Sequence, residues 1–338
     1  MPSSEEQTDV AVIGAGPVGL FAVFECGMLE MRCHLFDALG EPGGQCTALY
    51  PEKPIYDIPG YPRIAAGDLV DRLVEQAAPF APVYRLGSPV VRLEAAGSGF
   101  RIESAAGAAI AARAVIIAAG VGAFGPNRPP LPGIERFEGR SVFYFVRRRE
   151  DFRGRRVVVA GGGDTAVDWA LSLSEIAERV FVVHRRAKFR AAPQSVARLD
   201  ALARAGRVEL VVPYQLAGLE GEEGRLSAVL VADLEGGQRR LAADSLLPFF
   251  GLATNLGPLT GWSFDLDRDR ILVAPATCAT SRPGIFAIGD VATYPGKLKL
   301  ILSGFAEAAL AAHAIYPLVR PGEALHFEYS TTKGVPGR

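Results

Sequence analysis

The sequence predicts an α/β protein made of two three-layer domains, one of them inserted into the other. Two glycine-rich loops, residues 14–19 and 161–166, each follow a short apolar run and precede a helical pattern. A third apolar run, residues 285–288, ends in Gly-Asp and resembles a missing strand of the first domain. At 338 residues the chain is long enough for two Rossmann-like domains, each with its own core.

The first domain is expected to be discontinuous and to comprise residues 1–123 and 248–338. Most of its elements are bounded by Gly or Pro. In order they are a strand, helix and strand over 10–37, a loop-rich stretch over 42–62, a helix over 67–78, an antiparallel pair at 90–93 and 100–103, a strand over 114–119, the strand at 285–288, a helix over 303–316 stopped by Pro317, and a tail from about 320 to 338.

The inserted domain is expected to cover residues 124–247. Residues 122–133 are rich in Gly and Pro and predict one crossing between the domains, and the other is expected near 247–252. The domain opens with a strand at Arg156 and a second glycine loop. Further strand-like runs follow at 208–212, 226–232 and 245–250.

The residues at the end of the strand after each glycine loop differ in charge. Counting 23 residues from the first glycine reaches Asp37 in one domain and His184 in the other, where Arg185 and Arg186 follow. A carboxylate at this place accepts hydrogen bonds from a free ribose 2′-hydroxyl, whereas cations suit a 2′-phosphate. The first loop is therefore expected to bind FAD and the second NADPH, as in an NADPH-dependent flavoenzyme.

Composition limits the other classes of function. The net charge is −1, and residues 124–247 hold 20 Lys and Arg against 16 Asp and Glu, without the basic and aromatic pattern of nucleic-acid binders. No apolar run approaches the roughly 20 residues that span a bilayer, and the N-terminus resembles no signal peptide. A cytoplasmic protein without a membrane partner is therefore expected. None of the four cysteines forms a Cys-x-x-Cys pair, which argues against a zinc site and a local dithiol.

Together these motifs resemble the low-molecular-weight thioredoxin reductase family. The stretches Gly-Gly-Gly-Asp-Thr-Ala at 161–166 and His-Arg-Arg-Ala-Lys-Phe-Arg at 184–190 are specific to that group. Its Cys-x-x-Cys is missing, since residues 144–152 read Tyr-Phe-Val-Arg-Arg-Arg-Glu-Asp-Phe. A narrower resemblance, over nearly the whole chain, is to ferredoxin–NADP⁺ reductases of the thioredoxin-reductase-like type. The stretches that carry it are residues 44–60, 144–146 and 329–332.

The resemblance implies an FAD site in the first domain. The implied contacts are Gly14, Gly16 and Gly19 with the pyrophosphate, Asp37 with the adenosine ribose, Val90 with the adenine, Gln45 with the flavin or ribityl chain, Phe124 beside the cofactor, Asp290 with the ribityl chain, and Thr331 beside the flavin. Tyr50 would stack on one flavin face. Tyr329 would cover the other face in the partner subunit of a homodimer. A frayed C-terminal tail is the alternative for Tyr329.

The NADPH site implied by the resemblance lies in the inserted domain. The residues expected there are Gly161, Gly163 and Thr165 at the pyrophosphate and Arg185, Arg186 and Arg190 at the 2′-phosphate. NADPH would deliver a hydride to flavin N5, and the electrons would then leave singly to a ferredoxin or flavodoxin. Hydride transfer requires no acid–base residue, and no metal is expected.

Two features of the implied activity stay open. The arginines at 147–149, 153, 155 and 156 suit an acidic partner, and a solvated charged turn is an equal alternative. The electron acceptor is also open. An NADPH-dependent flavin, quinone or ferric reductase fits the same motifs, as does an FAD-holding redox sensor that does not turn over.

Overall fold

The structure is a computed structural model that describes residues 6–326 and 329–335, without the side chains at 123–124, 252–254, 330 and 333. It divides into unit 1, Met1–Phe124 with Thr254–Arg338, and unit 2, Gly125–Ala253. The second domain boundary therefore falls six residues later than the expected 247/248, just past the crossing expected near 247–252. The reason is that β16 (Ser245–Pro248) pairs with β10 (Arg156–Ala160) and belongs to the sheet of unit 2.

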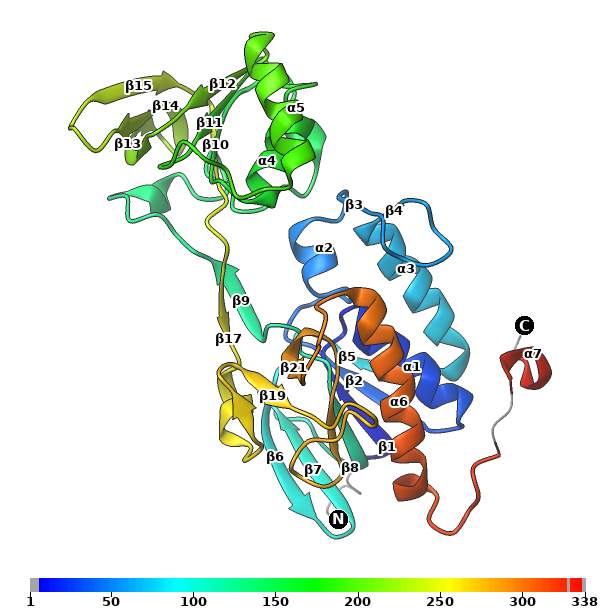
Figure 1. Cartoon of the computed structure of the whole chain (residues 1–338). Helices are drawn as coiled ribbons and strands as arrows, with labels where there is room; N and C mark the ends of the chain where they lie inside the picture. Colours follow the sequence, from blue (N-terminus) through cyan, green and yellow to red (C-terminus); the bar gives the residue numbers. More distant parts are fainter. Residues whose placement is uncertain (1–5, 327–328, 336–338) are drawn as a thin grey trace. The chain divides into compact units, whose positions relative to one another are not determined.

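Unit 1 is built on a seven-stranded sheet with β1 near its centre (Figure 1). In spatial order its strands are β5 (Val83–Arg85), β2 (Cys33–Phe36), β1 (Glu6–Ile13), β8 (Ala109–Ile117), β7 (Gly99–Ser104) and β6 (Val90–Ala96), with β20 (Ile285–Ala287) paired to β8. Strands β2, β1, β8 and β20 run parallel. The segments that follow β1, β2, β8 and β20 therefore meet at one edge of the sheet.

Helices cover one face of this sheet (Figure 1). Because side chains alternate along a strand, Val10 and Val12 pack under the helices, whereas Ala11 and Ile13 face the opposite layer. That second layer contains residues between Leu256 and Ala292. The covering helices are α1 (Pro17–Met28), α3 (Ala66–Ala77) and α6 (Ile301–Val319).

Helix α6 differs from the sequence prediction in two ways. It continues past Pro317, which lies in its last turn, and ends at Val319. With 19 residues and a mean hydropathy of 1.3 it is also long and apolar enough to cross a membrane, so the expectation of no such run was wrong. One such helix is weak evidence for a membrane span, because core helices have the same composition. Ala308 and Ile315 of α6 are buried in the core of unit 1.

The smaller elements of unit 1 include a helix in the stretch that the sequence predicts as loop. This helix, α2 (Gln45–Leu49), begins after two glycines with positive φ, Gly43 and Gly44. The others are β3 (Pro54–Ile55), β4 (Ile64–Ala65), β18 (Leu266–Asp267), β19 (Arg270–Leu272), β21 (Ala292–Thr293) and α7 (Ser330–Lys333).

Unit 2 contains a four-stranded parallel sheet in the order β12-β11-β10-β16. A three-stranded antiparallel sheet, in the order β13-β14-β15, packs into the same unit. The remaining bounds are β11 (Arg179–Val183), β12 (Val208–Val211), β13 (Gln215–Glu222), β14 (Arg225–Ala232), β15 (Gln238–Ala242), α4 (Asp164–Leu173) and α5 (Pro193–Arg204). Strands β9 (Ala123–Pro126) and β17 (Leu252–Asn255) pair where the chain crosses between units. The predicted fold class, two parallel-sheet α/β domains with one inserted, is confirmed.

Candidate functional site

The glycine loop of unit 1 joins β1 to α1 at the edge where the parallel strands end. Gly14 has φ +113°, and a Cβ on it would lie 2.3 Å from the carbonyl oxygen of Ala118. A Cβ on Gly19 would lie 1.9 Å from the carbonyl oxygen of Gly14. The fold itself therefore requires these two glycines. Gly16 differs, because its φ of −69° suits any residue and a Cβ there would meet nothing within 4 Å.

The open space at Gly16 has the room that the predicted pyrophosphate requires. Gly16 caps the N-terminus of α1, and no acidic side chain lies in the first turn of that helix. Backbone N–H groups at a helix N-terminus attract an anion. Since packing in the protein does not require a glycine here, a closely approaching pyrophosphate is a sufficient reason for one.

Asp37 lies directly over this loop. Its Oδ2 atom accepts a hydrogen bond of 2.6 Å from the backbone N–H of Ala15, and its Oδ1 atom accepts one of 2.8 Å from Leu39. Burial raises the pKa of Asp37, and the backbone N–H groups oppose that shift. These bonds fix the carboxylate beside the middle of the glycine loop, where the ribose of a dinucleotide would lie.

Three side chains predicted to contact the flavin end are brought to the same edge of the sheet. A Cβ on Gly120 would lie 3.9 Å from Nε2 of Gln45, which places that amide beside the end of β8. Tyr50 follows α2 and packs against the core of unit 1. Burial, then Cys46, then Asp290 raise the pKa of the Tyr50 hydroxyl, so both neighbours lie near it.

Asp290 belongs to a short 3₁₀ turn, Gly289–Val291, after β20. The backbone N–H of Gly289 donates a 2.7 Å hydrogen bond to Oε2 of Glu307 on α6, a residue that is 2% exposed. Glu307 is not among the residues that the sequence predicts for the site. A single carboxylate in an alanine-rich helix was the signal that could have found it.

The structure gives fewer contacts for the other residues that the sequence predicts for FAD. Val90 is buried in the same cluster as Phe36, near the end of β2. The side chain of Phe124 lies outside the described residues. Tyr329 is 70% exposed, and Thr331 lies in α7 just after it. Both residues are exposed in this single chain.

The glycine loop of unit 2 repeats the arrangement of unit 1. Gly161 has φ +154°, and a Cβ on it would lie 2.7 Å from the carbonyl oxygen of Phe249. A Cβ on Gly162 would lie 2.3 Å from the imidazole ring of His184. Gly163, with φ −97°, has nothing within 4 Å of a Cβ. This loop therefore leaves the same open space at a helix N-terminus, with Thr165 exposed in the first turn of α4.

His184 is the buried first residue of the loop that carries the predicted cations. Its ring stacks on Phe189 with 5.4 Å between centroids. Burial lowers the pKa of His184, and the charge of Arg190 lowers it further, which favours the neutral ring. Its buried Nε2 atom has no hydrogen-bond partner within the described part of the chain. This orphaned polar atom, beside the glycine loop, fits a ligand that completes the site.

Two hydrogen bonds tie this loop to the glycine loop. The backbone N–H of Arg190 donates to the carbonyl of Gly162 at 2.7 Å, and the N–H of Ala192 donates to Oδ1 of Asp164 at 2.8 Å. The sequence alone does not predict this role for Asp164. The cations that these bonds position are exposed, and none of them has an ion-pair partner in residues 6–326 or 329–335: Arg185, Arg186 and Arg190.

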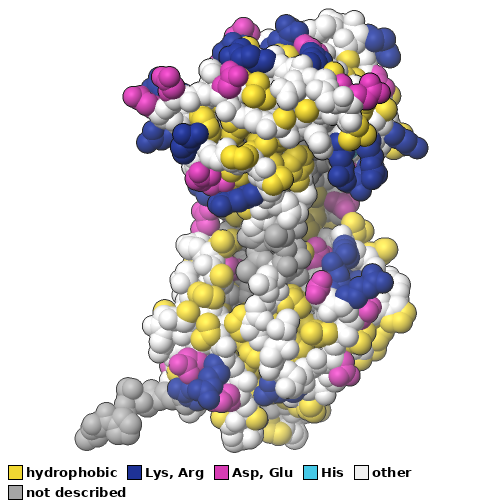
Figure 2. All heavy atoms as spheres, turned by 90° about the vertical axis from the view of Figure 1, so that its left-hand side faces the viewer, with side chains coloured by type: hydrophobic (Ala, Val, Ile, Leu, Met, Phe, Trp, Pro, Cys, Tyr) yellow, Lys and Arg dark blue, Asp and Glu magenta, His cyan; other side chains and the backbone are white. Residues whose placement is uncertain are grey.

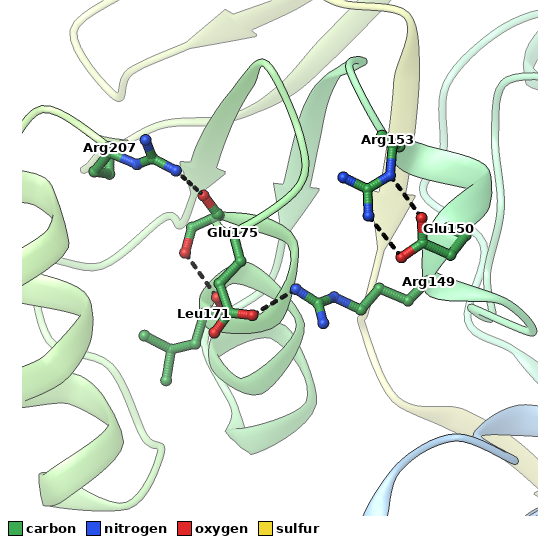
Figure 3. A network of polar contacts seen from close by, with 7 residues as sticks. Arg149, Glu150, Arg153, Leu171, Glu175 and Arg207 are labelled. Atoms are coloured by element: carbon green, nitrogen blue, oxygen red, sulfur yellow. Dashed lines mark hydrogen bonds and ion pairs between the residues drawn. The ribbon is translucent and has the colours of Figure 1, made fainter.

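The arginines at 147–156 contrast with this unpaired group. Figure 3 shows Arg149 paired with Glu175 at 2.6 Å and Arg153 with Glu150 at 2.7 Å. The other ion pairs in the run are Arg148 with Asp151 and Arg156 with Asp244. On the face drawn in Figure 2, basic and acidic side chains of unit 2 also lie side by side. The arginine run is therefore largely neutralised within the protein.

Glycine-to-alanine substitutions test the two open positions. Gly16→Ala is expected to weaken FAD binding about tenfold or more, and Gly163→Ala to weaken NADPH binding similarly, because the added methyl group occupies the ligand's space. The thermal midpoint of the ligand-free protein should change little. Gly19→Ala is the matched control and should destabilise the protein itself, because its Cβ meets backbone. Fluorescence titration and thermal unfolding measure both quantities, and unaltered affinities would contradict the assignment.

Cysteine and metal chemistry have little support in the described residues. All four cysteines are free and buried, and burial raises the pKa of Cys46 to about 11. A thiol with such a pKa is protonated at neutral pH and is a poor nucleophile. In residues 6–326 and 329–335, no group of three or more His, Cys, Asp or Glu is arranged to hold a metal ion.

Comparison with known proteins gives a consistent family. The family model described as pyridine nucleotide-disulphide oxidoreductase matches residues 8–314. A ferredoxin–NADP reductase of Rhodospirillum rubrum is 64% identical over 99% of this chain and 98% of the relative. One of Paramagnetospirillum magneticum is 65% identical over 98% and 99%. Among solved structures, Lactococcus lactis thioredoxin reductase aligns with a TM-score of 0.77 and 25% identity, over 93% of this chain and 99% of that one.

The matches extend over both units and agree with the geometry of the two glycine loops. Membership in this family confirms the expected cofactors, FAD and NADPH, and the expected class, an NADP-dependent flavoenzyme. The chain therefore belongs to the pyridine nucleotide-disulphide oxidoreductases and, within them, to the ferredoxin–NADP reductase family.

Proposed function

We propose that this enzyme passes electrons between NADP(H) and a one-electron carrier, a ferredoxin or a flavodoxin. The observation that carries the proposal is the pair of glycine loops with opposite charges at the following strand ends, in a protein whose four cysteines are all buried and free. The NADPH site would supply the electrons and the FAD site would pass them on, and the absence of a Cys-x-x-Cys from the sequence leaves no dithiol route to a disulfide substrate. The names of the relatives support the same acceptor.

The residues of the chain would bind, orient and shield the cofactors. When bound, FAD would accept a hydride from NADPH at N5 and release the electrons singly. The loop around Gly16 would hold the pyrophosphate of FAD, and Asp37 would hold its ribose. Tyr50 would exclude water from one flavin face, because a planar ring covers a large area at a small entropic cost. Arg185 and its neighbours would hold the 2′-phosphate of NADPH.

The C-terminal tail is proposed to cover the flavin of a partner subunit in a homodimer. Tyr329 supports this arrangement because it is 70% exposed although it is a large aromatic residue. Tyrosine is among the residue types that are enriched at protein–protein interfaces. The tail residues Tyr329 and Thr331 would then complete a site that one chain leaves uncovered.

The arginine run at 147–156 has little support as the docking surface for the carrier. An acidic carrier requires cations whose charge the protein has not already neutralised. Arg148, Arg149, Arg153 and Arg156 each have a carboxylate partner. Within the described part of the chain, two arginines of the run have no ion pair: Arg147, which is exposed, and Arg155, which is half-buried and donates to the Ser245 hydroxyl. We therefore expect the run to contribute weakly to docking.

The acceptor is tested by anaerobic stopped-flow reduction with NADPH, followed by mixing with ferredoxins and flavodoxins. Saturable reoxidation at micromolar carrier supports the proposal. Faster reoxidation by quinones, free flavins or ferric chelates would favour a general reductase instead. Bound FAD that NADPH does not reduce would favour a redox-sensing binding protein. The exposed, unpaired cations beside the second glycine loop argue against that last alternative.

A further inference from the structure

A buried charge cluster lies next to the Gly289–Val291 turn. Glu307 of α6 and Lys297 of the segment before α6 form an ion pair, with side chains only 3% and 5% exposed. The hydroxyl of Tyr294 donates a 2.7 Å hydrogen bond to Oε1 of Glu307, the same oxygen that contacts Lys297. The other oxygen, Oε2, accepts the 2.7 Å bond from the N–H of Gly289. One carboxylate thus joins three segments of the chain.

Stability alone does not account for this arrangement. A buried ion pair is often no more stabilising than apolar side chains of the same volume, because both charges lose their hydration. A carboxylate supplies something that an apolar side chain lacks, namely two acceptor oxygens for three donors. One of those donors is the backbone N–H of Gly289. This residue has φ +74° and directly precedes Asp290.

The same turn also packs beside the glycine loop of unit 1. A Cβ on Gly289 would lie 3.5 Å from the side chain of Val18, and a Cβ on Gly304 of α6 would lie 2.3 Å from it. Val18 follows Gly16 by two residues, at the start of α1. Glu307 therefore holds together the turn that carries Asp290 and the helix that packs against the pyrophosphate loop.

We propose that Glu307 is a positioning residue for FAD, which acts through the N–H of Gly289 to hold Asp290 toward the ribityl chain, and that Lys297 and Tyr294 hold Glu307. Glu307 is not proposed to touch the cofactor. The inference rests on the FAD site and not on the identity of the electron carrier, so its failure would leave the proposed function untouched.

Two double variants distinguish a positioning role of Glu307 from an effect of its buried charge. Lys297→Met with Glu307→Gln removes both charges but retains an amide oxygen that can accept from Gly289. Lys297→Met with Glu307→Leu removes the same charges and the acceptor. FAD affinity is measured by fluorescence on reconstituting the apoprotein, and the flavin midpoint potential by anaerobic dye titration. The thermal midpoint of each apoprotein reports any general loss of stability.

The Gln variant is expected to bind FAD within about threefold of the unmodified protein, whereas the Leu variant should bind about tenfold or more weakly, because Gly289 loses its acceptor. The flavin midpoint potential of the Leu variant should shift as well, while the apoproteins of both variants unfold at similar temperatures. Equal affinity and potential in the two variants would overturn the proposal. If the Leu variant does not fold, Glu307→Asp replaces it, because it retracts the carboxylate by one methylene while keeping its charge. An unchanged FAD affinity and flavin midpoint potential in Glu307→Asp would also overturn the proposal.

Discussion

Replacing Arg185 and Arg186 together with Ala is expected to raise the KM for NADPH about 100-fold and to leave the KM for NADH nearly unchanged. A charge-assisted hydrogen bond contributes roughly 1.5–3 kcal/mol, and two of them at the lower end account for this factor. Only NADPH carries the 2′-phosphate that these cations would bind. Steady-state kinetics with both coenzymes and a small-molecule electron acceptor measures the ratio.

The contrast between the two arginine groups of unit 2 provides the control. Arg148 and Arg153 are exposed like Arg185, but each already pairs with a carboxylate. Their double replacement with Ala removes the same formal charge from the same unit, and it should change neither KM for NADPH nor KM for NADH by more than about twofold. If Arg185→Ala/Arg186→Ala affects both coenzymes equally, the 2′-phosphate assignment is wrong.

The sequence predicted those features of the fold that depend on local pattern. Both glycine loops and the acidic and basic strand ends are local, and the structure has them at the expected residues, while each expected strand run overlaps a strand of the structure. Helix α2 was missed because five residues between glycines and prolines give no periodic signal. The end of α6 was misplaced because a proline in the last turn of a helix removes few backbone hydrogen bonds.

The candidate site was predicted less completely, because tertiary contacts decide it. Spacing identified Asp37 and His184, but it could not show that the Asp37 carboxylate bonds to Ala15 or that the His184 ring packs on Gly162. The charge of an arginine run is also visible in sequence, and so are the carboxylates within it, Glu150 and Asp151, whereas the rest of its neutralisation is not. Glu175 and Asp244, which pair with Arg149 and Arg156, are distant in sequence.

Removing residues 326–338 is expected to leave FAD bound and to expose one face of the flavin. The contacts assigned to Asp37 and to the loop around Gly16 do not involve the tail. If Tyr329 covers the flavin in a partner subunit, nicotinamide and the tyrosine ring compete for the same stacking position. NADPH should therefore reduce the truncated enzyme at an equal or higher rate. Oxygen consumption should rise and reduction of the carrier should fall.

Single substitutions at Tyr329 test whether its ring causes this effect. Tyr329→Ala should reproduce most of the truncation, and Tyr329→Phe little of it, because stacking depends on the planar ring and not on the hydroxyl. A partner subunit adds a further requirement, since the capping contact then depends on assembly. Flavin absorbance and oxygen uptake of the unmodified enzyme should accordingly approach those of the truncated one when dilution dissociates the dimer. Unchanged absorbance, oxygen uptake and reduction rate after truncation would mean that the tail does not cover the flavin, because removing a stacked ring must alter the environment of the cofactor.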